Sequence, residues 1–213
     1  MGIYNYFETR FSILRYNFSS YRRYSNILKI ILNIKPSKII EIGVYKGKRS
    51  IEMIKAAKSF NSKISFYGFD LFEMFYEKKD MIGKEFSKYP SNKIIIKEIL
   101  KKHADVNLIK GNTLKTLPKF KKKNKFDFIF IDGGHSLKTI KNDWKYMKKF
   151  MHKNSVVVFD DYYLGDKNII KKFGCNKLIE NLSKDYQVSF LEPKDYIPSS
   201  KIYVQLVKVE LRK

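Results

Sequence analysis

Three aspartates and one histidine are the side chains of this sequence best suited to chemistry. Asp132 ends the apolar run FDFIFID, His135 follows three residues later, and Asp160 and Asp161 end the run VVVFDD. If these runs are parallel strands, their ends lie on one side of the sheet and the side chains converge. Clustered carboxylates repel one another unless a cation neutralises them, and Mg²⁺ prefers oxygen ligands. The three aspartates are therefore predicted metal ligands, and His135 is a predicted general base.

A second set of residues has the pattern of a nucleotide-cofactor site. The stretch KIIEIGVYKG carries Glu41 near the end of an apolar run and then a turn that contains Gly43 and Gly47. Glycine is needed where the backbone turns sharply and approaches a ligand closely. The run FYGFD ends at Asp70, whose carboxylate can accept hydrogen bonds from both hydroxyls of a ribose. The spacing G-x-x-x-G is not the G-x-G-x-x-G of NAD sites, which counts against NAD.

These side chains require strands that end on one side of a sheet, with helices between them. The sequence predicts this arrangement, because apolar runs closed by polar residues alternate with helix-compatible segments. The predicted strands are 38–43, 64–70, 106–110, 126–132 and 155–160, followed by YQVSFL and KIYVQLVKVEL. The predicted helices are 24–34, 47–59, 92–103, 137–150 and 167–184. The predicted fold class is therefore α/β, with a mostly parallel sheet.

Length and composition indicate one globular domain. The chain has 213 residues, of which 44% are hydrophobic and 31% are charged, and this length can bury a substantial core. No apolar stretch approaches the roughly 18 residues that span a bilayer, and the N-terminus does not have the pattern of a secretory signal. The single cysteine, Cys175, excludes an intramolecular disulfide, so we expect a cytoplasmic protein.

The net charge of +23 makes polyanions candidate partners. Most of the positive charge comes from lysine, in a chain rich in Ile, Asn, Tyr and Phe, which is also the profile of a strongly AT-rich coding sequence. Both origins of the charge stay open. In either case we expect non-specific, salt-sensitive binding to nucleic acid.

From Lys38 to Tyr163 the order of motifs resembles the class I, Rossmann-like S-adenosylmethionine-dependent methyltransferases, and among them the small metal-dependent O-methyltransferases. The resemblance implies a three-layer sandwich whose seven-stranded sheet has an antiparallel strand near one edge. It also implies S-adenosyl-L-methionine as cofactor, a divalent metal such as Mg²⁺ at the three aspartates, and catalysis by His135 with Asp132. The implied cofactor contacts are Glu41, Gly43, Gly47, Ser50, Asp70, Leu71, Asn112, Thr113 and Asp132.

The implied reaction is methyl transfer to a hydroxyl of a small molecule, such as a sugar or another polyhydroxyl compound. One alternative is a metal-free enzyme, and another is a His135 that only caps the following helix or binds a water. An RNA methyltransferase and a non-catalytic binding protein on the same scaffold are further alternatives. Residues 1–37 are predicted to form a helical extension, a lid or dimer surface, before a methyltransferase domain over 38–213. Segment 71–91 is predicted to be a substrate-side insertion or a plain surface connection.

Overall fold

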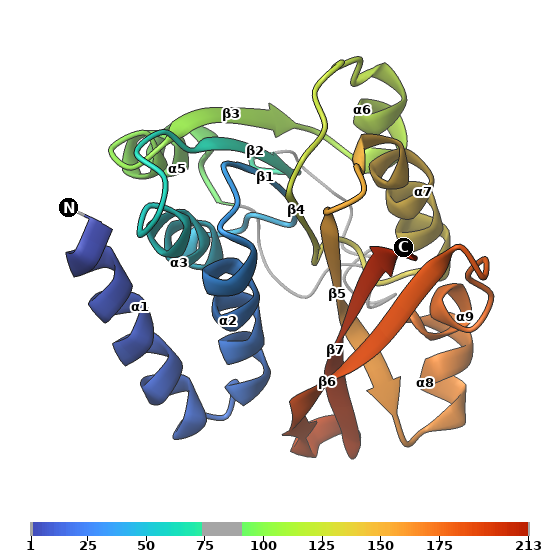
Figure 1. Cartoon of the computed structure of the whole chain (residues 1–213). Helices are drawn as coiled ribbons and strands as arrows, with labels where there is room; N and C mark the ends of the chain where they lie inside the picture. The colour runs from blue at the N-terminus through green and yellow to red at the C-terminus, as the bar shows by residue number, and fades with distance from the viewer. Residues whose placement is uncertain (1, 74–90, 213) are drawn as a thin grey trace.

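The computed structural model describes residues 2–73 and 91–212, which form three layers around a single mixed sheet (Figure 1). The strands are β1 Lys38–Ile42, β2 Ser65–Asp70, β3 Asp105–Lys110, β4 Phe128–Ile131, β5 Val156–Leu164, β6 Tyr186–Ile197 and β7 Ile202–Leu211. Their order across the sheet is β3-β2-β1-β4-β5-β7-β6. Strand β7 is antiparallel to β5 and β6, whereas β1 to β5 pair in parallel. The predicted sheet is confirmed, with its antiparallel strand next to the edge.

Helices cover both faces of this sheet (Figure 1). The α-helices are α1 Gly2–Asn17, α2 Ser25–Ile34, α3 Lys48–Ala57, α5 Lys93–Leu100, α6 Thr113–Thr116, α7 Leu137–Met147, α8 Lys167–Lys172 and α9 Asn176–Ile179. Short 3₁₀ turns are η1 Arg22–Tyr24, η2 Leu117–Lys119, η3 Lys148–Phe150 and η4 Pro198–Ser200. Helices α1, α2, α3 and α5 share one apolar core with the sheet, and α7 and α9 share the other.

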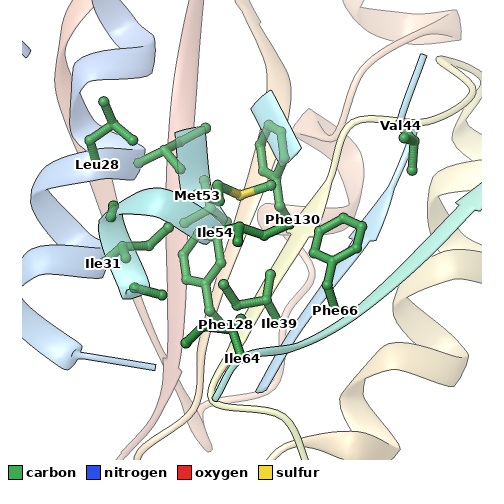
Figure 2. Close-up of a cluster of buried hydrophobic side chains, with 14 of the residues drawn as sticks. Leu28, Ile31, Ile39, Val44, Met53, Ile54, Ile64, Phe66, Phe128 and Phe130 are labelled. Atoms are coloured by element: carbon green, nitrogen blue, oxygen red, sulfur yellow. The ribbon is translucent and has the colours of Figure 1, made fainter. Parts of the chain in front are cut away.

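The two cores follow from the alternation of side chains along buried parallel strands. In β1, Ile39 packs into the core below α2 and α3, and Ile40 and Ile42 pack into the core on the other face. Figure 2 shows the first of these cores, where Ile39 lies among side chains from several elements, including Ile31 of α2 and Met53 of α3. Because helices cover both faces of the sheet, the sequences of these strands are almost continuously apolar.

The helices predicted in the first 37 residues are present. Helix α2 packs against α3, with Ile27, Leu28 and Ile31 almost completely buried. It ends at Ile34, and the capping residue Lys35 has a left-handed backbone with φ of 51°. Pro36 follows, which cannot continue a helix. The extension is therefore part of the packed domain, and its role as a lid or dimer surface stays a prediction.

The prediction that the fifth strand ends at Asp160 is wrong. Strand β5 continues to Leu164, and its pairing with β7 shifts register between Phe159 and Tyr162. Asp161 has a φ of 63° there, the backbone irregularity expected at a bulge. The two adjacent aspartates thus lie inside an irregular strand, where Asp160 pairs with Arg23 and Asp161 with His135.

The predicted helix over 167–184 is also wrong, because it is broken into α8 and α9. Gly174 lies between them with a φ of 82°. A Cβ at this position would lie 2.5 Å from the backbone oxygen of Asp161, so the chain turns where only glycine fits. The break brings residues 173–175 against the bend in β5.

Most of segment 71–91 lies outside the described residues, so its predicted role is not addressed. In the described part of the chain, no helix has the length and apolar character needed to cross a membrane.

Candidate active site

The glycine turn after β1 lies directly against the end of β4. The amide of Gly43 donates to the backbone oxygen of Phe69 over 2.8 Å, and Gly43 has a φ of 95°. A Cβ here would lie 1.8 Å from the backbone oxygen of Asp132. No side chain fits, so glycine at this position lets the ends of β1, β2 and β4 approach one another. Gly47, with a φ of 74°, then begins α3.

Asp70, at the end of β2, is tied to the glycine turn. Its Oδ2 accepts the backbone N–H of Tyr45 at 2.7 Å, and its Oδ1 accepts that of Phe72 at 3.0 Å. Both donors have a φ of 49°, so the carboxylate stabilises two strained turns. A carboxylate offers about four lone-pair positions, so Asp70 keeps acceptor capacity for the two hydroxyls of a ribose.

Glu41 is completely buried within β1. Its Oε2 accepts the hydroxyl hydrogen of Ser50, whereas its Oε1 has no hydrogen-bond partner among the described residues. Burial raises the pKa of Glu41 to about 8, because a carboxylate loses its hydration there. A buried acceptor without a partner is suited to a cationic group, and the contact of Glu41 with the amino group of S-adenosylmethionine stays a prediction.

The affinity for S-adenosylhomocysteine is expected to rise with pH. The ligand's ammonium group favours ionised Glu41, and below its pKa of about 8 the proton must leave on binding. The association constant should therefore increase by about 10-fold per unit between pH 6 and pH 7.5, and level off above pH 8. Calorimetry in two buffers of different ionisation enthalpy measures the proton release, and Glu41→Gln should abolish it. A pH-independent affinity in the wild type would contradict the assignment.

The other predicted cofactor contacts include Ser50, Leu71, Asn112 and Thr113. The hydroxyl of Ser50 is directed at Glu41, and the neighbouring Arg49 pairs with Glu52 at 2.6 Å. The side-chain oxygen of Asn112 caps α6 by accepting the amide of Leu114 at 2.9 Å. Thr113 follows and is buried, and Leu71 is half-buried after β2. Ser50 and Asn112 thus form hydrogen bonds within the protein, and their contact with a cofactor stays a prediction.

Asp160 forms a buried charge network with the extension. Arg23, in η1, donates from Nε to Asp160 Oδ1 at 2.9 Å and from Nη2 to Oδ2 at 3.0 Å. The hydroxyl of Tyr24 donates to the same Oδ2 at 2.7 Å. The remaining arm of Arg23, Nη1, lies 2.7 Å from Asp195 Oδ2 in β6. All three charged side chains are nearly inaccessible to solvent, so this network fixes the extension to the bend in β5.

The charges in this network stabilise one another against burial. Burial alone would raise the pKa of Asp160, but the guanidinium of Arg23 keeps it below its usual range. Burial would likewise lower the pKa of Arg23, and Asp160 raises it instead. The pKa of Tyr24 is well above its ordinary value because of burial and the charges of Asp160 and Asp132. Asp160 and Arg23 therefore stay charged near neutral pH, and Tyr24 stays neutral.

The predicted metal ligands do not fit a divalent ion in this arrangement. Both oxygens of Asp160 accept hydrogen bonds from Arg23, and Oδ1 also accepts the amide of Asp161 at 2.8 Å. Across residues 2–73 and 91–212, no group of three or more His, Cys, Asp or Glu side chains is arranged to hold a metal. The positive charge next to Asp160 is supplied by Arg23.

His135 and Asp161 form the second part of the site. His135 Nε2 lies 3.3 Å from Asp161 Oδ2, and both side chains are about four-fifths buried. The backbone holds them in place, because the amide of Gly174 donates to the oxygen of His135 and that of Cys175 to the oxygen of Asp161. Ser136, not His135, caps α7 by accepting the amide of Thr139. The alternative that His135 caps this helix is therefore wrong.

Sequence reasoning missed the role of Arg23, Tyr24 and Asp195. The sequence assigns residues 1–37 to a helical extension, a lid or dimer surface, and gives Arg23 no role of its own, yet its guanidinium is buried. It contacts Asp160 across 137 positions of sequence and Asp195 across 172. No local motif marks such pairs. The only signal was an arginine just before an apolar helix.

The comparisons with known proteins concern the family and the fold. Residues 40–162, more than half of the chain, match the family model described as a methyltransferase domain. A search of curated protein sequences finds no match. Three solved structures illustrate the similarity in fold. An O-methyltransferase from Bacillus cereus in complex with S-adenosylhomocysteine is 15% identical, with a TM-score of 0.60 over 98% of this chain and 90% of that chain.

The other two are described as an O-methyltransferase and an N-methyltransferase. TomG from Streptomyces achromogenes, an O-methyltransferase involved in tomaymycin synthesis, was solved with S-adenosylmethionine and is 15% identical, with a TM-score of 0.58 over 88% of this chain and 78% of that chain. The N-methyltransferase NodS from Bradyrhizobium japonicum is 14% identical, with a TM-score of 0.58 over 90% and 95%. At such identities the likeness concerns the fold. Together with the family match, it shows that the chain belongs to the methyltransferase-domain family and is a class I S-adenosylmethionine-dependent methyltransferase.

Proposed function

We propose that this enzyme transfers a methyl group to a hydroxyl of a small molecule, such as a sugar or another polyhydroxyl compound. The observation that carries the proposal is the pair of His135 Nε2 and Asp161 Oδ2, 3.3 Å apart. A hydroxyl becomes a good nucleophile only when it loses its proton, and a histidine oriented by a carboxylate is suited to accept it. The resemblance to the catechol-type O-methyltransferases, which carry a basic catalytic residue at the matching position, supports this role of His135.

In this proposal, one pair of residues binds the cofactor and another pair transfers the proton. S-adenosylmethionine, when bound, supplies an electrophilic methyl group on a sulfonium. Asp70 would hold the ribose of this cofactor, and Glu41 would hold its amino group. If the hydrogen on His135 Nε2 is shared with Asp161, Nδ1 is the nitrogen that takes the proton from the hydroxyl. Asp161 then stabilises the imidazolium by its negative charge.

In the proposed reaction, Arg23 and not a metal ion supplies the positive charge next to Asp160. Because Arg23 neutralises Asp160, the acid cluster does not need a divalent ion to offset its repulsion, which supports the metal-free alternative. The Mg²⁺ predicted from the sequence stays a prediction. A divalent ion, if required, would have to displace Arg23 from Asp160, at the cost of an unpaired buried guanidinium.

A methyl-transfer assay tests both parts of the proposal. Protein treated with chelator is incubated with S-adenosylmethionine carrying a labelled methyl group and a panel of sugars, polyols and phenols. We expect transfer to at least one hydroxyl compound, at the same rate with EDTA as with Mg²⁺. Transfer only to amines, or to RNA at physiological salt, would contradict the hydroxyl assignment. A rate that falls to background with EDTA would contradict the metal-free mechanism.

A further inference from the structure

The outward face of α1 carries a continuous apolar stripe. It consists of Ile3, Phe7, Phe11 and Leu14, and it continues at Phe18 just after the helix. These side chains are between 56% and 92% exposed. The intervals of four, four, three and four residues place all five on one side of a helix. Figure 1 shows α1 at the outside of the molecule, next to α2 and α3.

Packing of the domain does not require this stripe. Helix α1 contacts α2 and α3 through its opposite face, where Asn5, Thr9, Ile13 and Tyr16 are buried. A helix that only covers a domain normally presents polar residues to water on its outer face. Large apolar side chains grouped on one exposed surface mark a site of contact with something else.

Arginines lie along both sides of the stripe. At 100° per residue, Arg10 falls on one side of Phe7 and Phe11, and Arg15 falls on the other. Both arginines are exposed, and Arg15 lies 3.6 Å from Glu52 while its side chain stays 59% exposed. The one acidic residue of the helix, Glu8, is paired with Lys55 at 2.6 Å. The exposed surface of α1 is therefore apolar in the middle and positively charged at its margins.

The charge of the whole chain decides between candidate partners. A second copy would bring two chains of net charge +23 together, and they repel each other. An anionic bilayer attracts the same charge, takes apolar side chains into its headgroup region, and pairs arginines with lipid phosphates. We propose that the outward face of α1 docks on an anionic lipid surface, with the stripe inserted and Arg10 and Arg15 at the phosphates.

Vesicle sedimentation with the full chain tests this proposal. We expect binding to phosphatidylcholine vesicles that contain about 30% phosphatidylglycerol, and weak binding to phosphatidylcholine alone. The double variant Phe7→Ser/Phe11→Ser should reduce the partition coefficient by about 10- to 100-fold. The variant Arg10→Gln/Arg15→Gln should reduce it by about 10-fold or more at low salt. The matched control is Ile94→Ser/Ile95→Ser, which removes two exposed apolar side chains from α5 and should leave binding unchanged.

Three outcomes would overturn the proposal. Equal binding of wild type and the Phe7/Phe11 variant would mean that charge alone holds the protein on vesicles. No binding of the wild type to anionic vesicles would exclude the membrane. A dimer in light scattering that this variant abolishes, without vesicle binding, would assign the stripe to a second copy. Unchanged melting and S-adenosylhomocysteine affinity of the variant show that it is folded, so a loss of binding supports the stripe.

Discussion

Replacing Arg23 with methionine is expected to lower the free energy of unfolding by about 3–5 kcal/mol. Methionine fills most of the space of the arginine stem but leaves Asp160 and Asp195 buried without their cation. Both carboxylates are about 97% inaccessible to solvent, so water cannot replace the lost partner. Urea unfolding, followed by circular dichroism, measures the change.

The neighbouring Arg22 provides the matched control, because it is exposed on the same 3₁₀ turn. Arg22→Met should change the unfolding free energy by less than about 0.5 kcal/mol. The double variant Arg23→Met/Asp160→Asn should recover part of the loss, since it removes the unpaired charge. A loss below about 1 kcal/mol in Arg23→Met would show that the network does not hold the extension on the domain.

The variant Arg23→Met also tests whether a metal ion binds at Asp160. If the wild type binds Mg²⁺ in calorimetry at millimolar concentration, the metal predicted from the sequence gains support and Arg23 must move. If only Arg23→Met binds it, the guanidinium excludes the ion in the natural protein.

Replacing His135 with alanine is expected to lower kcat by about 10²- to 10⁴-fold, the usual range for a lost general base. His135 pairs with Asp161, whereas the proposed cofactor contacts are Glu41 and Asp70. The affinity for S-adenosylhomocysteine should therefore change by less than about twofold. Single-turnover transfer to the acceptor found in the screen measures the first effect, and calorimetry measures the second.

A second histidine variant separates the chemistry from a general loss of stability. His103→Ala lies outside the site and should keep full activity. Asp161→Asn, which keeps the shape but not the charge beside the imidazolium, should lower kcat by a smaller factor than His135→Ala. Full turnover in His135→Ala would show that the base is another group.

The backbone positions of Gly43, Gly47 and Asp70 in the candidate cofactor site could be predicted from the sequence, because their signals are local. Gly43 and Gly47 lie at a turn where positive φ is required, and the structure shows both. Asp70 follows an apolar run directly, so its position at the end of β2 depends only on that strand. The resemblance to a known fold implied a seven-stranded sheet with an antiparallel strand near one edge, whereas the order of the strands comes from the structure.

The parts that could not be predicted depend on contacts between distant residues. The pairing of Arg23 with Asp160 needs the extension to fold back onto β5, and no pattern near either residue signals this. The break at Gly174 was missed because the flanking segments both have helix-compatible sequences. The extension of β5 to Leu164 was missed because Asp160 and Asp161 look like the polar end of a strand, whereas pairing with β7 continues beyond them.

The central claim is that this chain binds S-adenosylmethionine at the ends of β1 and β2, and calorimetric titration with S-adenosylhomocysteine tests it most directly. The wild type should bind one equivalent, and Asp70→Ala should weaken binding by about 100-fold, since two hydrogen bonds from the ribose to a charged acceptor are lost. Asp105→Ala removes an exposed carboxylate from β3 and should leave the affinity unchanged. Absence of binding by the wild type, or equal binding by Asp70→Ala, would contradict the account.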